Sequence, residues 1–354
     1  MAVSRAASRR RAEEPVETLT PLWPPAPFSV PTVPWLAPVW QRLMRLQQQD
    51  RLPHGLLLLG APGQGVVELA RHFADWLLCL QPIHTPGNER ACGVCSACQW
   101  RLAGSHPDLL WVKAEAGKEI GVDDIRGLID AFAMTRQGAL RVALIEQAEQ
   151  MSRSAANSLL KLLEEPPVGS VFLLTATSAE RLPATIRSRV QRFAPSVPSA
   201  ATRQHWLVEQ RGISADEAAL LIFLGDSGLL DGQVPDWDWQ GIAEAWLMLW
   251  QAPEKLPLVV QRWQTVPRPV LAQWLLRLWT ASAQLRVGLP SDAPPALLPL
   301  LRRLAAQESA LDAQKRYRIL MAFAQTATHP LNEELALERL ALDLIRQDLP
   351  EQID

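Results

Sequence analysis

GLLLLGAPGQGVV, residues 55–67, joins an apolar run to a loop that contains three glycines. Four leucines in succession are typical of a strand that is buried on both faces of a parallel sheet. The amphipathic segment 68–78 predicts a helix directly after the loop. A strand, a glycine loop and a helix in this order resemble a P-loop, whose backbone N–H groups surround phosphate.

Two positions of this loop depart from a working P-loop. Gly60, Gly63 and Gly65 allow the turn, but the next two residues are Val66 and Val67. A working loop has a lysine there, which contacts the phosphates, and then a Ser or Thr, which binds magnesium. Valine supplies neither charge nor oxygen. We therefore expect a loop that keeps its shape and a chain that binds no ATP as a cofactor.

Short apolar runs recur along the first half of the chain. They cover residues 109–113, 141–145 and 171–175, and amphipathic helical segments separate them. From Trp35 to about Pro195 this alternation predicts an α/β domain, a parallel sheet with flanking helices.

After the Pro and Ser cluster at 194–199, the sequence shows the spacing of helices and no further strand-like runs. Apolar residues recur every three or four positions in 242–250, 270–279 and 331–345. The second half is therefore expected to be all α-helical, with its clearest break at 225–239, where Gly, Asp and Pro gather.

The run RVALIEQAE, residues 141–149, is placed like the strand that ends in Asp-Glu in nucleotide hydrolases. Those two acids organise magnesium and the attacking water. Glu146 stands at the first position and Gln147 at the second, and an amide cannot act as a general base. Glu149 would need a different backbone path to compensate. This segment also predicts a chain without ATPase activity.

All four cysteines fall within residues 79–98, at Cys79, Cys92, Cys95 and Cys98. Four thiolates arranged tetrahedrally suit a structural zinc ion, and the C-x-x-C-x-x-C spacing lets one tight loop present three of them. Disulfides or scattered free thiols are the alternative, but a reducing cytosol and the exclusive clustering argue against them, and an iron–sulfur cluster is a minor alternative. His84 lies between the first two cysteines, and we expect it to be an exposed loop residue rather than a ligand.

The segments 151–167 (MSRSAANSLLKLLEEPP), 171–175 and 185–190 (TIRSRV) resemble the bacterial clamp-loader branch of the AAA+ family. In that family a cysteine module follows the P-loop helix, both in the ATP-hydrolysing gamma or tau subunits and in a subunit with a degenerate P-loop. Val66 and Val67 place this chain with the latter.

The resemblance implies an AAA+ P-loop-like α/β domain with a zinc module, a small helical lid and an all-α collar. With the composition shifts, it predicts a Pro-rich leader at 1–33, the ATPase-like domain at 34–197 with the zinc module at 79–98, the lid at 198–238 and the collar at 239–354. In relatives that hydrolyse ATP, an arginine follows shortly after the Gly and Ser cluster of the lid. The corresponding segment of this chain, 224–229, lacks that arginine.

The resemblance also implies one catalytic group that acts in trans. The family's Ser-Arg-Cys motif corresponds to Ser188, Arg189 and Val190, so the cysteine is replaced and the arginine is kept. A guanidinium can bridge two phosphate oxygens and stabilise charge in the transition state. Arg189 is therefore the candidate arginine finger for a neighbouring subunit, and Arg187 is the alternative.

The implied partners are gamma or tau and delta subunits in a five-subunit ring. The ring would load the sliding clamp on primed DNA and touch that DNA at its backbone. A formal net charge of -2 argues against a chain coated in positive potential. No apolar run suits a membrane or a secretory signal, so we expect a cytoplasmic protein. An active gamma- or tau-like ATPase and a zinc-containing DNA-binding module remain as alternatives.

Overall fold

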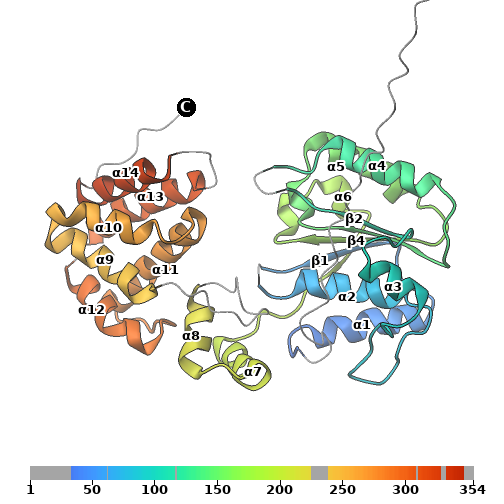
Figure 1. The fold of residues 1–354 in the computed structure, drawn as a ribbon, viewed down its shortest axis with the longest axis horizontal. Coiled ribbons are helices and arrows are strands. Elements are labelled where there is room, and N and C mark those ends of the chain that lie inside the picture. The colour runs from blue at the N-terminus through green and yellow to red at the C-terminus, as the bar shows by residue number, and fades with distance from the viewer. Residues whose placement is uncertain are drawn as a thin grey trace, which may run out of the picture.

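The computed structural model describes residues 33–61, 63–115, 118–224, 238–307, 310–327 and 332–346 (Figure 1). Nearly all of the predicted leader lies outside these ranges. So do residues 225–229, most of the segment noted for its missing arginine.

Five parallel strands form one sheet in the order β2-β3-β4-β1-β5. The sequence predicted the first four of them. The fifth was missed because its three residues, Gln-Arg-Phe, contain no apolar run. The bounds are β1 Gly55–Leu59, β2 Leu109–Val112, β3 Arg141–Ile145, β4 Ser170–Ala176 and β5 Gln191–Phe193.

Both faces of the sheet are covered by helices. Successive residues of a strand point to opposite faces, so Leu56 and Leu58 join a core with α1 (Ala37–Gln48) and α2 (Val66–Leu78). Leu57 joins a second core with α4 (Val122–Ala133) and α5 (Arg153–Glu164). Figure 1 shows the two helix pairs on opposite sides of the strands. The predicted α/β layering is therefore confirmed.

Short elements connect these layers. They are α3 (Ser96–Leu102), η2 (Ala148–Gln150), η3 (Ala179–Arg181) and α6 (Ala184–Arg187). Ser152 begins α5 as an N-cap, because its hydroxyl accepts a hydrogen bond from the Ala155 N–H at 3.2 Å.

Two helices that follow β5 pack back against the α/β domain. They are α7 (Ala200–Arg211) and α8 (Ala215–Leu224). Trp206 and Leu207 from α7 belong to the same core as α1 and α2. Trp206 meets the ring of Trp35 edge to face at 5.5 Å between centroids. These two helices therefore share a core with the sheet.

The remaining described residues form a group of helices around a tryptophan-rich core (Figure 1). Trp246, Trp263 and Trp274 are almost fully buried there. None of the described helices is long and apolar enough to cross a membrane. The bounds are α9 Trp239–Gln251, η4 Pro253–Lys255, α10 Leu256–Trp263, α11 Arg268–Arg286, η5 Pro295–Leu297, α12 Leu298–Gln307, α13 Ala310–Thr326 and α14 Glu333–Arg346.

Candidate functional site

The glycine loop lies at the carboxyl end of β1, where open α/β sheets bind their ligands. Gly63 (φ 80°) and Gly65 (φ 82°) adopt left-handed backbone conformations that glycine reaches at little cost. Helix α2 begins at Val66, whose side chain is buried in the core, and Val67 beside it is half-buried. The loop thus has the position and turns of a P-loop, with hydrocarbon where the lysine and hydroxyl belong.

The carboxylate after β3 is already bound by an arginine. Glu146 is 8% exposed, and Arg71 of α2 donates from Nε to Glu146 Oε1 at 2.8 Å. Nη2 of Arg71 lies 2.8 Å from the same oxygen. Burial raises the pKa of Glu146 above its usual range, and the charge of Arg71 opposes this shift. A group that would face magnesium in a hydrolase is here paired with a guanidinium.

Gln147 and Glu149 both make hydrogen bonds to nearby residues of their own chain. The Gln147 N–H donates to Thr175 Oγ1 at 3.0 Å, and the Gln147 side-chain oxygen accepts from Gln150 Nε2 at 2.5 Å. Glu149 Oε1 accepts from the N–H and the hydroxyl of Thr177, at 2.9 and 2.6 Å. Glu149 therefore fixes the loop after β4.

The four cysteines converge on one point although Cys79 ends α2 and Cys98 lies within α3. The Sγ atoms of Cys79 and Cys98 are 3.7 Å apart, those of Cys79 and Cys95 are 3.9 Å apart, and those of Cys92 and Cys98 are 4.0 Å apart. A disulfide would require about 2.05 Å, and all four thiols are free. Four sulfurs about 2.3 Å from a tetrahedral zinc ion would be about 3.8 Å apart. The group is thus compatible with a metal site.

Backbone N–H groups also donate to two of the sulfurs in this cluster. The Cys92 N–H donates to Cys79 Sγ at 3.2 Å, and the Cys95 N–H donates to Cys92 Sγ at 3.3 Å. Burial raises the pKa of the Cys79 and Cys98 thiols, since a buried thiolate without a counter-charge is poorly solvated. His84 is exposed and packs edge to face on Trp76, with 5.5 Å between ring centroids, outside the four-sulfur group.

A buried ion pair fastens the cysteine module to the α/β domain. Arg101 of α3 lies 3.2 Å from Asp75 of α2, and the two side chains are 9% and 10% exposed. Arg101 follows Cys98 by three residues in the sequence. Its partner is one of many acids in the chain, so no local pattern could have identified the pair.

Arg189 lies at the amino edge of the sheet, just before β5. A Cβ atom on Gly55, the first residue of β1, would be 3.1 Å from the Arg189 carbonyl oxygen. The glycine loop begins at the other end of the same five-residue strand, about 15 Å away at the rise of a β-strand. Arg189 therefore lies at the end of the sheet where the strands begin, and the loop lies at the end where the strands finish.

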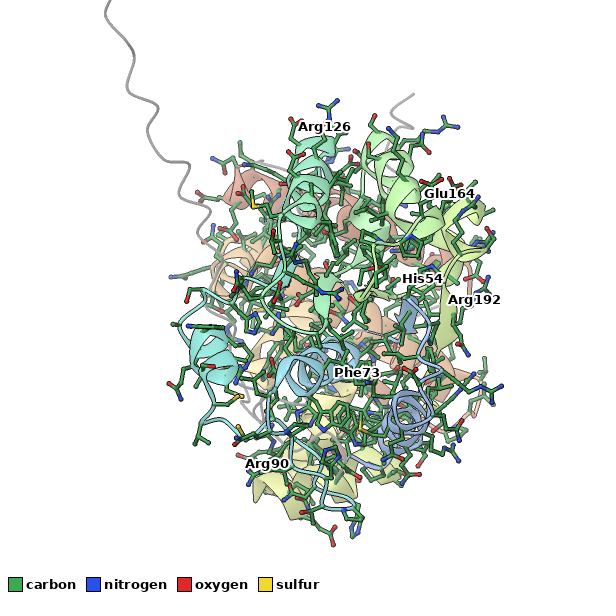
Figure 2. All side chains as sticks on the ribbon, turned by 90° about the vertical axis from the view of Figure 1, so that its right-hand side faces the viewer. His54, Phe73, Arg90, Arg126, Glu164 and Arg192 are labelled. Carbon is green, nitrogen blue, oxygen red and sulfur yellow. The ribbon has the colours of Figure 1, made fainter. Side chains whose placement is uncertain are left out.

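The Arg189 guanidinium is held by its own chain. Nη2 lies 2.5 Å from Oε1 of Glu164, and Nη1 donates to the Thr185 carbonyl at 2.9 Å and to Ser188 Oγ at 3.2 Å. The Arg189 side chain is 33% exposed. Figure 2 shows the region of Glu164 and of His54, whose ring contacts the carbonyl of Leu163 at 3.1 Å. Ser188, the other predicted residue here, donates to the Thr185 carbonyl at 3.0 Å.

The fold brings only some of the predicted site residues together. The glycine loop and the ends of β3 and β4 share the carboxyl edge of the sheet, while the cysteine cluster and Arg189 are separate from it. Sequence reasoning missed three helical residues that form ion pairs at these sites. They are Arg71, which pairs with Glu146, Asp75, which pairs with Arg101, and Glu164, which pairs with Arg189.

Comparison with known proteins finds one family model, curated relatives and solved structures that resemble this chain. The family described as "DNA polymerase III, delta subunit" matches residues 35–196. DNA polymerase III subunit delta' of Pseudomonas aeruginosa is 37% identical over 70% of this chain and 75% of the relative. The Escherichia coli subunit delta' is 34% identical over 63% of this chain and 72% of the relative. A gamma subunit-related protein from Thermotoga maritima, 19% identical, matches 86% of this chain and 99% of its own, with a TM-score of 0.41.

The parallel sheet, the glycine loop after β1 and the all-helical C-terminal half define a P-loop-like α/β protein with a second, helical part. Within that class, the chain belongs to the family of DNA polymerase III delta prime subunits.

Proposed function

We propose that this chain is the clamp-loader subunit that hydrolyses no ATP itself and supplies Arg189 to the ATP site of a neighbouring subunit. Membership of the delta prime family supports the clamp-loader role. The valines at the start of α2, the ion-paired Glu146 and the amide of Gln147 support a silent nucleotide site.

The separation of Arg189 from its own glycine loop is the observation that carries this proposal. The two lie at opposite edges of the sheet, one before β5 and the other after β1. A guanidinium cannot span the length of the strand, about 15 Å, to act in cis. It is instead exposed enough to meet a phosphate that another chain presents.

The other parts of the molecule have structural roles in this scheme. Cys79, Cys92, Cys95 and Cys98 would hold a zinc ion that closes the module on α2 and α3. The helices α9 to α14 would form a collar that joins gamma or tau and delta subunits in a five-subunit ring. Primer-template DNA would be touched at its backbone, and the clamp would be contacted indirectly. A cytoplasmic site of action follows from this role.

Reconstitution tests the proposal. The isolated chain should show no magnesium-dependent ATP turnover, whereas mixing it with gamma or tau and delta subunits should give one complex on gel filtration. The complex should hydrolyse ATP when the clamp and primed DNA are added. Turnover by the isolated chain would favour an active ATPase, and failure to join the complex would remove the loader role.

A further inference from the structure

The glycine loop is filled from within by the side chain of Gln64. Gln64 is 7% exposed, and its Oε1 accepts a hydrogen bond from the backbone N–H of Ala61 at 3.1 Å. In a working P-loop the backbone N–H groups donate to phosphate oxygens. In this chain a neutral amide oxygen accepts the N–H of Ala61, a backbone donor of this loop.

The side chain of Val66 also occupies the space next to Gly60. A Cβ atom on Gly60 would overlap Cγ2 of Val66 and would lie 3.0 Å from Oε1 of Gln64. The space next to Gly60 is therefore occupied by a valine methyl group and an amide oxygen. Val66 is itself 5% exposed, so this contact is part of the core and not a surface feature.

The backbone of Gln64 is also fixed from outside the loop. The indole N–H of Trp35 donates to the Gln64 carbonyl at 2.9 Å, and Trp35 is 2% exposed. A turn bond from the Gln64 N–H to the Ala61 carbonyl, 3.1 Å, closes the loop on itself. These hydrogen bonds at Ala61 and Gln64 hold the loop in its shape without any ligand.

We infer that Gln64 is an internal substitute for phosphate, and that this occupancy excludes nucleoside di- and triphosphates in addition to the loss of the lysine. The inference rests on the proposed function, in which this site is silent, and gives the silence a second cause. Restoring the two missing side chains alone would leave Gln64 competing for the N–H group that a phosphate needs.

The test measures binding of Mg-ATP to the purified full-length chain by calorimetry. The variant V66K/V67T restores the lysine and the hydroxyl and keeps Gln64, whereas Q64G/V66K/V67T also removes the amide. The triple variant should bind at least roughly tenfold more tightly than the double variant, because one buried hydrogen bond and a steric block are removed. Equal binding by the two variants, including equal absence of binding, overturns the inference.

A second measurement covers the case in which these variants do not fold. Hydrogen exchange of the Ala61 amide should speed up by roughly tenfold in Gln64→Ala, and Gln64→Glu, which keeps an acceptor oxygen, should remain protected. Unchanged exchange in Gln64→Ala overturns the inference. Mg-ATP hydrolysis by the unmodified chain would instead contradict the proposed function, so the two failures are distinguishable.

Discussion

Arg189, in the turn that joins α6 to β5, forms an ion pair with Glu164 at the end of α5, with 2.5 Å between Nη2 and Oε1. The side chains are 33% and 48% exposed, so solvent screens the pair. Nη1 makes two further hydrogen bonds to the same chain. A phosphate from a neighbouring subunit would therefore have to replace or share these contacts.

This geometry predicts that Glu164 contributes little to stability. Glu164→Gln should change the free energy of unfolding by no more than about 1 kcal/mol, because an exposed ion pair is weak. Urea denaturation of the isolated chain measures the change. The neighbouring Glu165→Gln is the matched control, since Glu165 is also exposed at the end of α5. A loss of several kcal/mol in Glu164→Gln alone would mean that the pair is a structural element and not a surface contact.

The cysteine cluster predicts the metal content. The double variant C92S/C95S should lose about one zinc ion per chain and unfold more easily, because closing a folded loop around an ion contributes folding free energy. Native mass spectrometry gives the metal count, and thermal melting gives the stability. His84→Ala should keep its metal, because His84 packs on Trp76 and not among the sulfurs. Full metal content in the double variant would contradict the four-thiolate site.

The buried pair between Asp108 and Arg141 predicts a large stability effect. Asp108 is 1% exposed and accepts from Arg141 and from the N–H groups of Gln137 and Gly138. Asp108→Ala should lower the free energy of unfolding by about 3–5 kcal/mol, because a buried guanidinium loses its partner. The control Asp123→Ala removes an exposed ion pair and should have little effect. Equal urea midpoints for the two variants would contradict this account.

His72 predicts a pH dependence of stability. Burial lowers the pKa of His72 below 6.5, and the charge of Arg101 acts in the same direction, while its contacts with Glu89 oppose the shift. The unfolded chain therefore binds the proton more readily, and stability is lost as the pH falls below 6.5 toward the lowered pKa.

Urea unfolding of the wild-type chain and of His72→Gln, each at pH 7.5 and pH 6, isolates this contribution. The wild-type chain should lose more free energy of unfolding than the variant on acidification. Zinc release would lower the stability of both proteins, so its effect cancels when the two losses of free energy are subtracted. Equal losses would show that His72 does not titrate as its burial requires.

The sequence predicted those features that depend on nearby residues. The strand 55–59 and the glycine loop are contiguous, and the four cysteines follow one another within a short segment, so their chemistry is visible along the chain. Contacts between distant residues were not visible. Arg71 and Glu146 are 75 positions apart, and only the packing of α2 against β3 brings them together. Strand β5 was missed because its edge position requires no apolar run.

The side chain that fills the glycine loop shows the same limit. The two valines indicated from sequence that ligands were missing, because motif positions define what each side chain should contact. Gln64 occupies a motif position where any residue is allowed, so its inward orientation could not be inferred. It became visible only with the hydrogen bond from Ala61 and the contacts around Gly60.

We propose that Arg189 acts in the ATP site of a neighbouring subunit, and the variant Arg189→Ala in the reconstituted loader tests this role. The variant should assemble normally, because only an exposed ion pair and two surface hydrogen bonds are lost. Clamp- and DNA-stimulated ATP turnover at the one site that borrows this residue should fall by roughly tenfold or more. Arg189→Lys should restore part of that loss, since an ammonium keeps the charge but not the planar fork, and Arg187→Ala should leave turnover unchanged. Normal assembly with wild-type turnover in Arg189→Ala would contradict the account.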